Sequence, residues 1–278
     1  MRYAAVALLI AAIIPSAARA QAPRREGRPL PARPEVEAPE LVVKPQPDSP
    51  LRLSMTITRV GDPRTYWVNY SVENLSERDV SAYTVRRTPG NNILGLCDGY
   101  MGHLAHDKVL RPGRWDARST IPGFSPPSPV YTFEVDYVEF TDGSTWGADA
   151  CRTSEYLAGA RAGAAAAVVR LLGLLAGGGP EIVTRAVKDE LEGFGPDAVM
   201  NEAVRLGLAK RGPDGVLRAV KGEAVRGQSS DGHSPVWELG FFIGTKAIAN
   251  RVRDAVRNSG PDEIETTLRL PYDAAGAQ

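Results

Sequence analysis

Apolar and polar residues alternate along the chain from Leu51 onward. The alternation recurs in four stretches, residues 51–60, 66–72, 80–85 and 130–140. A period of two places one face of a strand against a core and the other face in water. Turn-forming residues separate the stretches, and Asp142-Gly143 is the strongest signal, because a two-residue hairpin turn needs a positive φ that glycine accepts. The pattern predicts an antiparallel β-sandwich over residues 51–152.

The stretch 130–140 is the longest of the four and carries two charges within its alternation. Its expected buried face consists of Tyr131, Phe133, Val135 and Tyr137. Glu134 and Asp136 fall on the opposite face, which we expect to be in water. Alternating charges of this kind usually mark a solvated face, so we do not interpret the two carboxylates as a catalytic acid–base pair.

The turns of this region carry a family resemblance. The stretches "VNYSVENLSERDVSAYTV", "LRPGRW" and "VDYVEFTDGSTWG" lie within residues 66–147. They resemble secreted bacterial proteins that bear an immunoglobulin-like domain, and they are similar to FxLYD-type domains, although the F-x-L-Y-D tetrad itself is absent. The resemblance implies an extracytoplasmic immunoglobulin-like β-sandwich, and it brings no catalytic residue with it.

The chain becomes helical in character after Cys151. Thr153 or Ser154 can cap a helix that the glycines and proline of residues 177–180 would end. Its expected buried stripe is Leu157, Ala160, Ala164, Val168 and Leu171. Arg161 and Arg170 interrupt the apolar run, so a packed helix is favoured over a membrane span.

Three shorter segments, near residues 180, 196 and 213, each open with Gly-Pro and an acid, a pattern typical of a helix start. "PEIVTRAVK" (180–188) and "PDGVLRAVK" (213–221) agree at six of nine positions, which we interpret as coincidence rather than a repeat. Residues 234–260 predict the clearest helix, with Ser234 as its cap and Gly260 as its stop. Gly240 and Gly244 within it permit close helix contact. The sequence therefore predicts an α+β chain, in which an immunoglobulin-like antiparallel β-sandwich is followed by a helical region at 153–278.

The N-terminus has the pattern of a cleavable export signal. Residues 1–20 hold an arginine, an apolar run too short for a membrane span, and the small residues of Ala18-Arg19-Ala20. Eight prolines follow between residues 22 and 50. Because proline fixes φ and donates no hydrogen bond, residues 21–50 predict an extended, disordered linker. We expect a secreted or periplasmic protein without a transmembrane span after signal cleavage.

The charges of the chain balance, with 33 basic and 33 acidic residues. Nucleic-acid-binding domains usually carry a basic excess, so that class of partner is not expected. The partner that remains is a protein or another component of the cell envelope, which the sequence does not identify.

Residues 97–107 contain the first candidate for chemistry. Cys97, His103 and His106 could bind zinc, with Asp98 or Asp107 as a fourth ligand. Neither paired C-x-x-C motifs nor H-E-x-x-H occurs, and two glycines precede the histidines. The alternative uses the other cysteine. An exported chain with two cysteines predicts one disulfide, Cys97–Cys151, and this interpretation is favoured over the metal site. No cofactor is expected.

A second polar loop, residues 227–234, gathers Ser229, Ser230, Asp231 and His233. It misses the G-x-S-x-G spacing of a nucleophile elbow and follows no predicted strand, so we interpret it as a plain loop. Two function classes remain. An exported non-catalytic interaction or structural protein is favoured. The alternative is a small exported hydrolase or metal-binding protein that uses the 97–107 or 227–234 loop.

Overall fold

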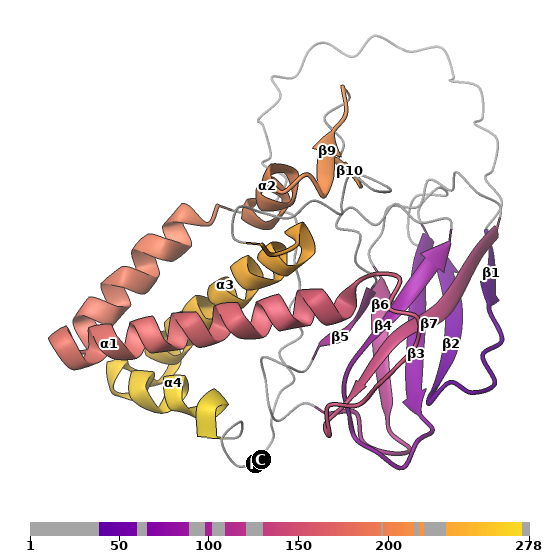
Figure 1. The fold of residues 1–278 in the computed structure, drawn as a ribbon, viewed down its shortest axis with the longest axis horizontal. Helices are drawn as coiled ribbons and strands as arrows, with labels where there is room; N and C mark the ends of the chain where they lie inside the picture. Colours follow the sequence, from indigo (N-terminus) through magenta and orange to yellow (C-terminus); the bar gives the residue numbers. More distant parts are fainter. Residues whose placement is uncertain are drawn as a thin grey trace, which may run out of the picture. The chain divides into compact units, whose positions relative to one another are not determined.

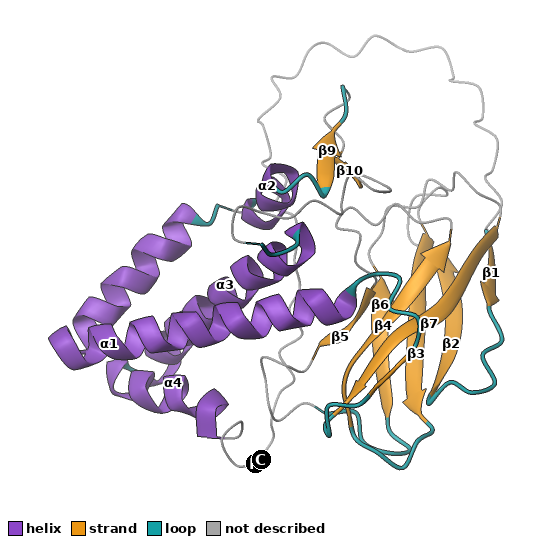
Figure 2. Cartoon of the chain, in the orientation of Figure 1, coloured by secondary structure: helices purple, strands orange, loops and turns teal. Residues whose placement is uncertain are grey.

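The structure is a computed structural model that describes residues 39–59, 66–88, 98–101, 109–120, 130–195, 197–213, 217–219 and 232–273. The chain divides into two compact units, Met1–Glu35 and Val36–Gln278, and every described residue belongs to the second. The predicted signal peptide and the predicted linker up to residue 38 lie outside the described residues. Eight strands precede the first helix, so the predicted α+β class is confirmed (Figures 1 and 2).

Two sheets make up the β region. The larger sheet has the order β1-β7-β4-β5, with β8 also paired to β7, and the smaller sheet has the order β2-β3-β6. All pairings are antiparallel except that of β1 with β7, which is parallel. The strands are β1 (Glu40–Val43), β2 (Leu51–Arg59), β3 (Tyr66–Asn74), β4 (Val80–Thr88), β5 (Asp98–Met101), β6 (Trp115–Thr120), β7 (Val130–Phe140) and β8 (Thr145–Trp146).

The four alternating stretches all form strands, namely β2, β3, β4 and β7. The predicted hairpin at Asp142-Gly143 joins β7 to β8, and Gly143 has the expected positive φ of 82°. The β1 strand contradicts the predicted disorder of residues 21–50, because it lies within that segment. The apolar run Leu41-Val42-Val43 pairs with the start of β7, and the Gln46 side chain then bonds both the N–H and the C=O of Val135 at 2.8 and 2.9 Å. Pairing with a distant strand thus orders a segment that its proline content alone would leave disordered.

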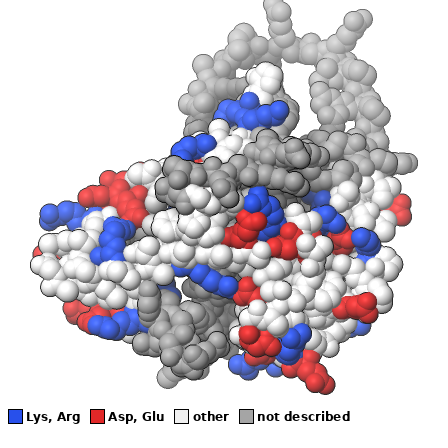
Figure 3. Space-filling view, viewed as in Figure 1, with Lys and Arg blue, Asp and Glu red and all other residues white. Residues whose placement is uncertain are grey.

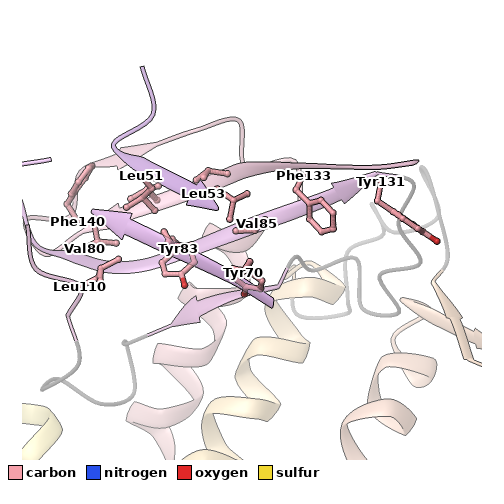
Figure 4. Packing of buried hydrophobic residues seen from close by; sticks show 13 residues of the cluster. Leu51, Leu53, Tyr70, Val80, Tyr83, Val85, Leu110, Tyr131, Phe133 and Phe140 are labelled. Atoms are coloured by element: carbon pink, nitrogen blue, oxygen red, sulfur yellow. The ribbon is translucent and has the colours of Figure 1, made fainter. Parts of the chain in front are cut away.

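Side chains from both sheets fill one hydrophobic core, which we call the β core (Figure 4). Val72 of the smaller sheet and Tyr83 of the larger sheet are fully buried within it. Burying a valine or leucine side chain contributes about 1.5–3 kcal/mol, so the inward faces hold the two sheets together. The β core consists of Leu51, Leu53, Tyr70, Val72, Val80, Tyr83, Val85, Leu110, Tyr131, Phe133, Val135, Val138 and Phe140.

The alternation of β7 breaks at Asp136. Val135 and Val138 both belong to the β core, although they are three positions apart. The register against β4 shifts at this point, so that Asp136 is an extra residue in the ladder, a β-bulge. Tyr137 therefore points away from the β core and packs against the helices, and its predicted place beside Val135 is wrong.

The second correction on β7 concerns its charged residues. Glu134 and Asp136 were expected on a solvated face, but they are only 8% and 2% exposed. Basic side chains cover the first, and the connection from β8 to the first helix covers the second. The alternation predicts one buried and one solvent-exposed face, whereas both faces of β7 are covered.

The helical region consists of α1 (Thr153–Gly193), α2 (Ala198–Arg205), α3 (Pro235–Ser259) and α4 (Ile264–Asp273), with a 3-10 turn at Pro261–Glu263. Gly179 interrupts α1 with a φ of 75°, and Pro180 opens the segment that follows. The predicted stop at residues 177–180 is thus a reversal between two arms, residues 153–178 and 180–193. Arg170 and Glu190 form an ion pair between the arms.

The predicted buried stripe of α1 is confirmed at Leu157, Ala160, Val168 and Leu171, each at most 1% exposed. By length and composition, α1 is also the one helix among the described residues that could cross a membrane. An 18-residue stretch of it has a mean hydropathy of 1.5, and 22% of that stretch is buried inside the protein. Length and composition alone do not separate a membrane span from an apolar helix of a folded domain.

Glycines set the contact between α1 and α3. A Cβ atom at Gly159 or Gly163 would overlap a backbone carbonyl of α3, and one at Gly240 or Gly244 would overlap a carbonyl of α1. The predicted close approach at Gly240 and Gly244 is therefore confirmed, with α1 as the partner. The two helices pack backbone against backbone, which only residues without a side chain allow.

The nine-residue similarity between 180–188 and 213–221 does not correspond to a repeat. The first copy is helical and opens the second arm of α1, whereas the second copy contains β10 (Leu217–Ala219), which pairs with β9 (Ala209–Arg211). The predicted helix start at residue 213 is wrong, because this strand pairing overrides the local preference. The interpretation as coincidence is confirmed.

The helical region also packs on the larger sheet. A sheet–helix cluster joins Ala82 and Tyr137 of the sheet to Tyr156 and Leu157 of α1, and further members come from α2, β9 and α3. At its edge, Arg161 of α1 forms an ion pair with Glu139 of β7. The β region and the helices thus share buried surface.

Candidate functional site

Most of the predicted chemistry of the 97–107 loop lies outside the described residues. This applies to Cys97, His103, His106 and Asp107, whereas Asp98 opens β5. Cys151 is 6% exposed and disulfide-bonded. The predicted partner, Cys97, is not described, so the Cys97–Cys151 pairing stays a prediction. Within the described part of the chain, no group of three or more His, Cys, Asp or Glu residues could hold a metal ion.

The structure describes only the last residues of the 227–234 loop. Ser229, Ser230 and Asp231 lie outside the described residues. His233 stacks on Trp237, with ring centroids 3.8 Å apart. Ser234 caps α3 as predicted, because its Oγ accepts the Trp237 N–H at 3.2 Å. Its hydroxyl also donates to Glu155 of α1. His233 and Ser234 therefore have structural contacts at the start of α3.

The buried carboxylates of β7 are engaged in structural bonds. Glu134 accepts hydrogen bonds from Lys44 and Arg86, each at 2.7 Å. Burial raises the pKa of Glu134, but the bonds from these two cations outweigh it and hold the pKa below its ordinary value. Asp136 accepts the backbone N–H groups of Ala150 and Cys151 at 3.1 and 2.9 Å, and burial raises its pKa.

Glu139, at the boundary between the larger sheet and α1, is likewise a buried carboxylate engaged in structural bonds. It accepts bonds from Arg161, from the Ser81 hydroxyl at 3.0 Å and from the Tyr137 hydroxyl at 3.1 Å. Burial raises the pKa of Glu139, but the Arg161 guanidinium outweighs it and lowers the pKa overall. Glu139 therefore holds the β region to α1, and Asp136 holds the connection that leads into α1. They are not arranged as an open acid–base pair.

A groove between the second arm of α1 and the C-terminal half of α3 has room for a ligand. Its volume is about 410 Å³, and its lining combines an aliphatic floor with polar and charged residues on the rim. Pockets that bind small molecules have volumes of about 300–1,000 Å³ and are mostly apolar. The lining residues are Thr184, Val187, Lys188, Leu191, Glu192, Val252, Arg253, Val256 and Arg257.

A regular pattern of residues builds this groove. Its aliphatic floor comes from two pairs at a spacing of four, Val187 with Leu191 and Val252 with Val256, and such pairs lie on one face of a helix. Val187 and Val252 are only 2% and 0% exposed, so the half-buried Leu191 and Val256 present the surface of the floor. A charged residue directly follows each of the four, and those residues are Lys188, Glu192, Arg253 and Arg257. Consecutive residues are about 100° apart around a helix, so the charges border the apolar floor.

The charges on the rim differ in their pairing. Lys188 and Glu192 lie 3.8 Å apart and are about 70% exposed, and Arg253 bonds the adjacent Asp254 at 2.9 Å. Among the described residues, Arg257 has no ion-pair partner. The spacing of Val252 and Val256, four positions apart, is typical of one face of a helix. The groove itself could not be predicted from the sequence, because its opposite wall depends on the reversal of α1 at Gly179.

One face of the described chain carries mixed charge. On the face drawn in Figure 3, lysines and arginines alternate with aspartates and glutamates in small groups. This arrangement agrees with the balanced composition of 33 basic and 33 acidic residues.

The comparisons with known proteins assign no family. No protein-family model matches the sequence, and searches of curated proteins and of solved structures find no match. The resemblance to secreted immunoglobulin-like domains therefore depends on the turn motifs quoted above.

Proposed function

We propose that this is an exported, non-catalytic interaction protein, in which an immunoglobulin-like β-sandwich supports a helical binding module. The order of the strands favours this fold. When β2 to β8 are lettered A, B, C, C′, E, F and G, one sheet holds A-B-E and the other C′-C-F-G. Immunoglobulin-like and fibronectin-like domains divide their strands between two sheets in this manner. The strand β1 is an addition at the edge of the second sheet.

The observation that carries the binding function is the apolar groove on α1 and α3. Its floor is aliphatic, and the groups on its rim are arginines, a lysine, a threonine and one glutamate. Such a surface lowers its free energy by taking up apolar material, at about 25 cal/mol for each Å² removed from water. The carboxylates of β7 lie on another element and are held by structural bonds. Uptake of an apolar ligand is therefore the activity that the described residues support best.

Export is the second part of the proposal. It is supported by the signal-like residues 1–20 and by the disulfide at Cys151, since disulfides persist in oxidising compartments. The proposed location is the periplasm or the extracellular medium, where a helical module fixed to a β-domain can meet envelope components.

Binding of a neutral hydrophobic dye such as Nile red to the full chain tests the proposal. We expect one saturable site per chain. Val256→Trp should fill the mouth of the groove and weaken dye binding by about tenfold, a change of about 1.4 kcal/mol. The matched control is Val169→Trp, because Val169 is 62% exposed on α1 and does not line the groove. Equal dye binding by both variants would contradict the groove as the binding site. Circular dichroism checks that each variant is folded.

A further inference from the structure

The rim of the groove favours one sign of charge. Three cations, Lys188, Arg253 and Arg257, border the apolar floor, against one acid, Glu192. Lys188 and Glu192 are both exposed and 3.8 Å apart, a geometry in which an ion pair contributes little. Arg253 shares its charge with Asp254. Arg257 is the cation on this rim that has no ion-pair partner among the described residues, so it remains available to an anion.

The floor defines the other half of the ligand. Leu191 and Val256 are half-buried and present aliphatic side chains with no hydrogen-bond donor or acceptor, above the buried Val187 and Val252. A polar ligand body would lose its bonds to water there without replacement, which is unfavourable. The volume of about 410 Å³ lies near the lower end of the range for ligand pockets. The groove therefore suits one slender apolar chain better than a bulky ligand.

From this charge complementarity we infer that the ligand is a fatty-acid anion, with its single acyl chain along the aliphatic floor and its carboxylate on Arg257. The inference rests on the proposed binding function. Guanidinium groups match carboxylates with two parallel N–H···O bonds, and such charge-assisted bonds are among the strongest in proteins. Lys188 and Arg253 add positive potential on either wall. An amphipathic acidic helix of a partner protein could use the same features, and the experiment separates it from a fatty acid.

The experiment uses the full chain, freed of bound lipid, and measures displacement of Nile red by palmitate, by hexadecanol and by an acidic amphipathic helical peptide. Palmitate and hexadecanol have chains of equal length, so they differ in the carboxylate. We expect palmitate to bind at least about tenfold more tightly than hexadecanol. We also expect rising salt to weaken palmitate binding alone, because salt screens exposed charges.

Variants then assign the carboxylate contact. Arg257→Gln should reduce the affinity for palmitate about tenfold and leave that for hexadecanol unchanged. Arg111→Gln is the matched control, because Arg111 is exposed in the β region, far along the chain from the groove residues, and has no side-chain ion pair among the described residues. It should leave both affinities unchanged.

The outcomes distinguish this inference from the proposed function. Equal affinities for palmitate and hexadecanol would overturn the anionic ligand and keep the apolar groove. Displacement of the dye by the acidic peptide but not by palmitate would overturn the fatty acid in favour of a protein partner. Loss of palmitate affinity in Arg111→Gln as large as in Arg257→Gln would overturn the assigned contact. Failure of wild-type protein to bind Nile red would refute the proposed function itself.

Discussion

The β region and the helical region of this protein are held together in different ways. The β core is filled by large side chains such as Tyr83 and Phe140, which are at most 1% exposed. The contact between α1 and α3 combines an aliphatic cluster with glycines, where missing side chains let the backbones meet. The first arrangement tolerates changes of shape if volume is kept, whereas the glycine positions of the second tolerate no added atom. The β region thus depends on large side chains, whereas the helical region depends both on aliphatic side chains and on glycines where α1 and α3 approach most closely.

The largest expected effect falls on the β region, through its disulfide. The chain has two cysteines, and the buried Cys151 is disulfide-bonded. Reduction, or Cys97→Ser, should lower the free energy of unfolding by about 2–5 kcal/mol, the usual cost for a native disulfide in a small secreted domain. Urea denaturation with and without a reductant measures this.

The control for the disulfide prediction is the metal alternative. His103→Ala and His106→Ala should change stability by no more than about 0.5 kcal/mol, as loop substitutions usually do. Free thiols in the oxidised protein, together with destabilisation by a chelator, would reverse this interpretation in favour of metal binding.

The next effect separates the helical region from the β region. Gly244→Ala places a Cβ against the carbonyl oxygen of Ala160, and we expect a loss of about 1–3 kcal/mol, as for other overpacked sites. Gly173→Ala is the control, because no atom lies within 4 Å of its Cβ position. An alanine in an exposed helix is favoured over glycine by about 0.5–1 kcal/mol, so this variant should be more stable.

Urea denaturation followed by circular dichroism compares the two glycine variants. Because the sheet–helix cluster joins the regions, Gly244→Ala should shift the signals of strands and helices together. Similar stability of Gly244→Ala and Gly173→Ala would show that the two helices do not depend on glycine at their contact.

The smallest effect concerns the ion pair that joins the two regions. Arg161 lowers the pKa of Glu139 below its ordinary value of 4.5, so the carboxylate adds stability above that pH and loses it as the pH falls through the folded pKa. Glu139→Gln should therefore cost about 1 kcal/mol at pH 7, and the difference from wild type should vanish in acid. Urea midpoints between pH 7 and pH 3 measure this.

Glu181→Gln serves as the reference for the pH series, because Glu181 is exposed and has no ion pair among the described residues. A gap between wild type and Glu139→Gln that stayed constant with pH would show that the carboxylate charge is not what joins the regions.

Sequence periodicity predicted the elements whose order is local. The bounds of β7 match at both ends, and α3 has its predicted cap at Ser234 and its stop at Gly260. Features that depend on residues distant in the sequence could not be predicted from periodicity. The bulge at Asp136 arises only against β4, and β1 pairs with β7, whose residues follow about 90 positions later.

The groove is the clearest example of this limit. The spacing of Val252 and Val256 indicates one helix face, but the residues that face this pair follow the reversal at Gly179, which the sequence marked only as a helix stop. Taken one helix at a time, the charged residues of the rim have the pattern of ordinary surface charges. A site formed between two helices can be identified only when the contact between the helices is known.

The glycine contact between α1 and α3 also bears on how the protein can evolve. Positions 159, 163, 240 and 244 accept no side chain, so in any set of natural variants they should be the least variable of the helical region. Leu191 and Val256 of the groove are only half-buried and are under less restriction, since valine, leucine and isoleucine can replace one another there. Selection can thus retune what the groove holds while the two helices that carry it keep a fixed geometry.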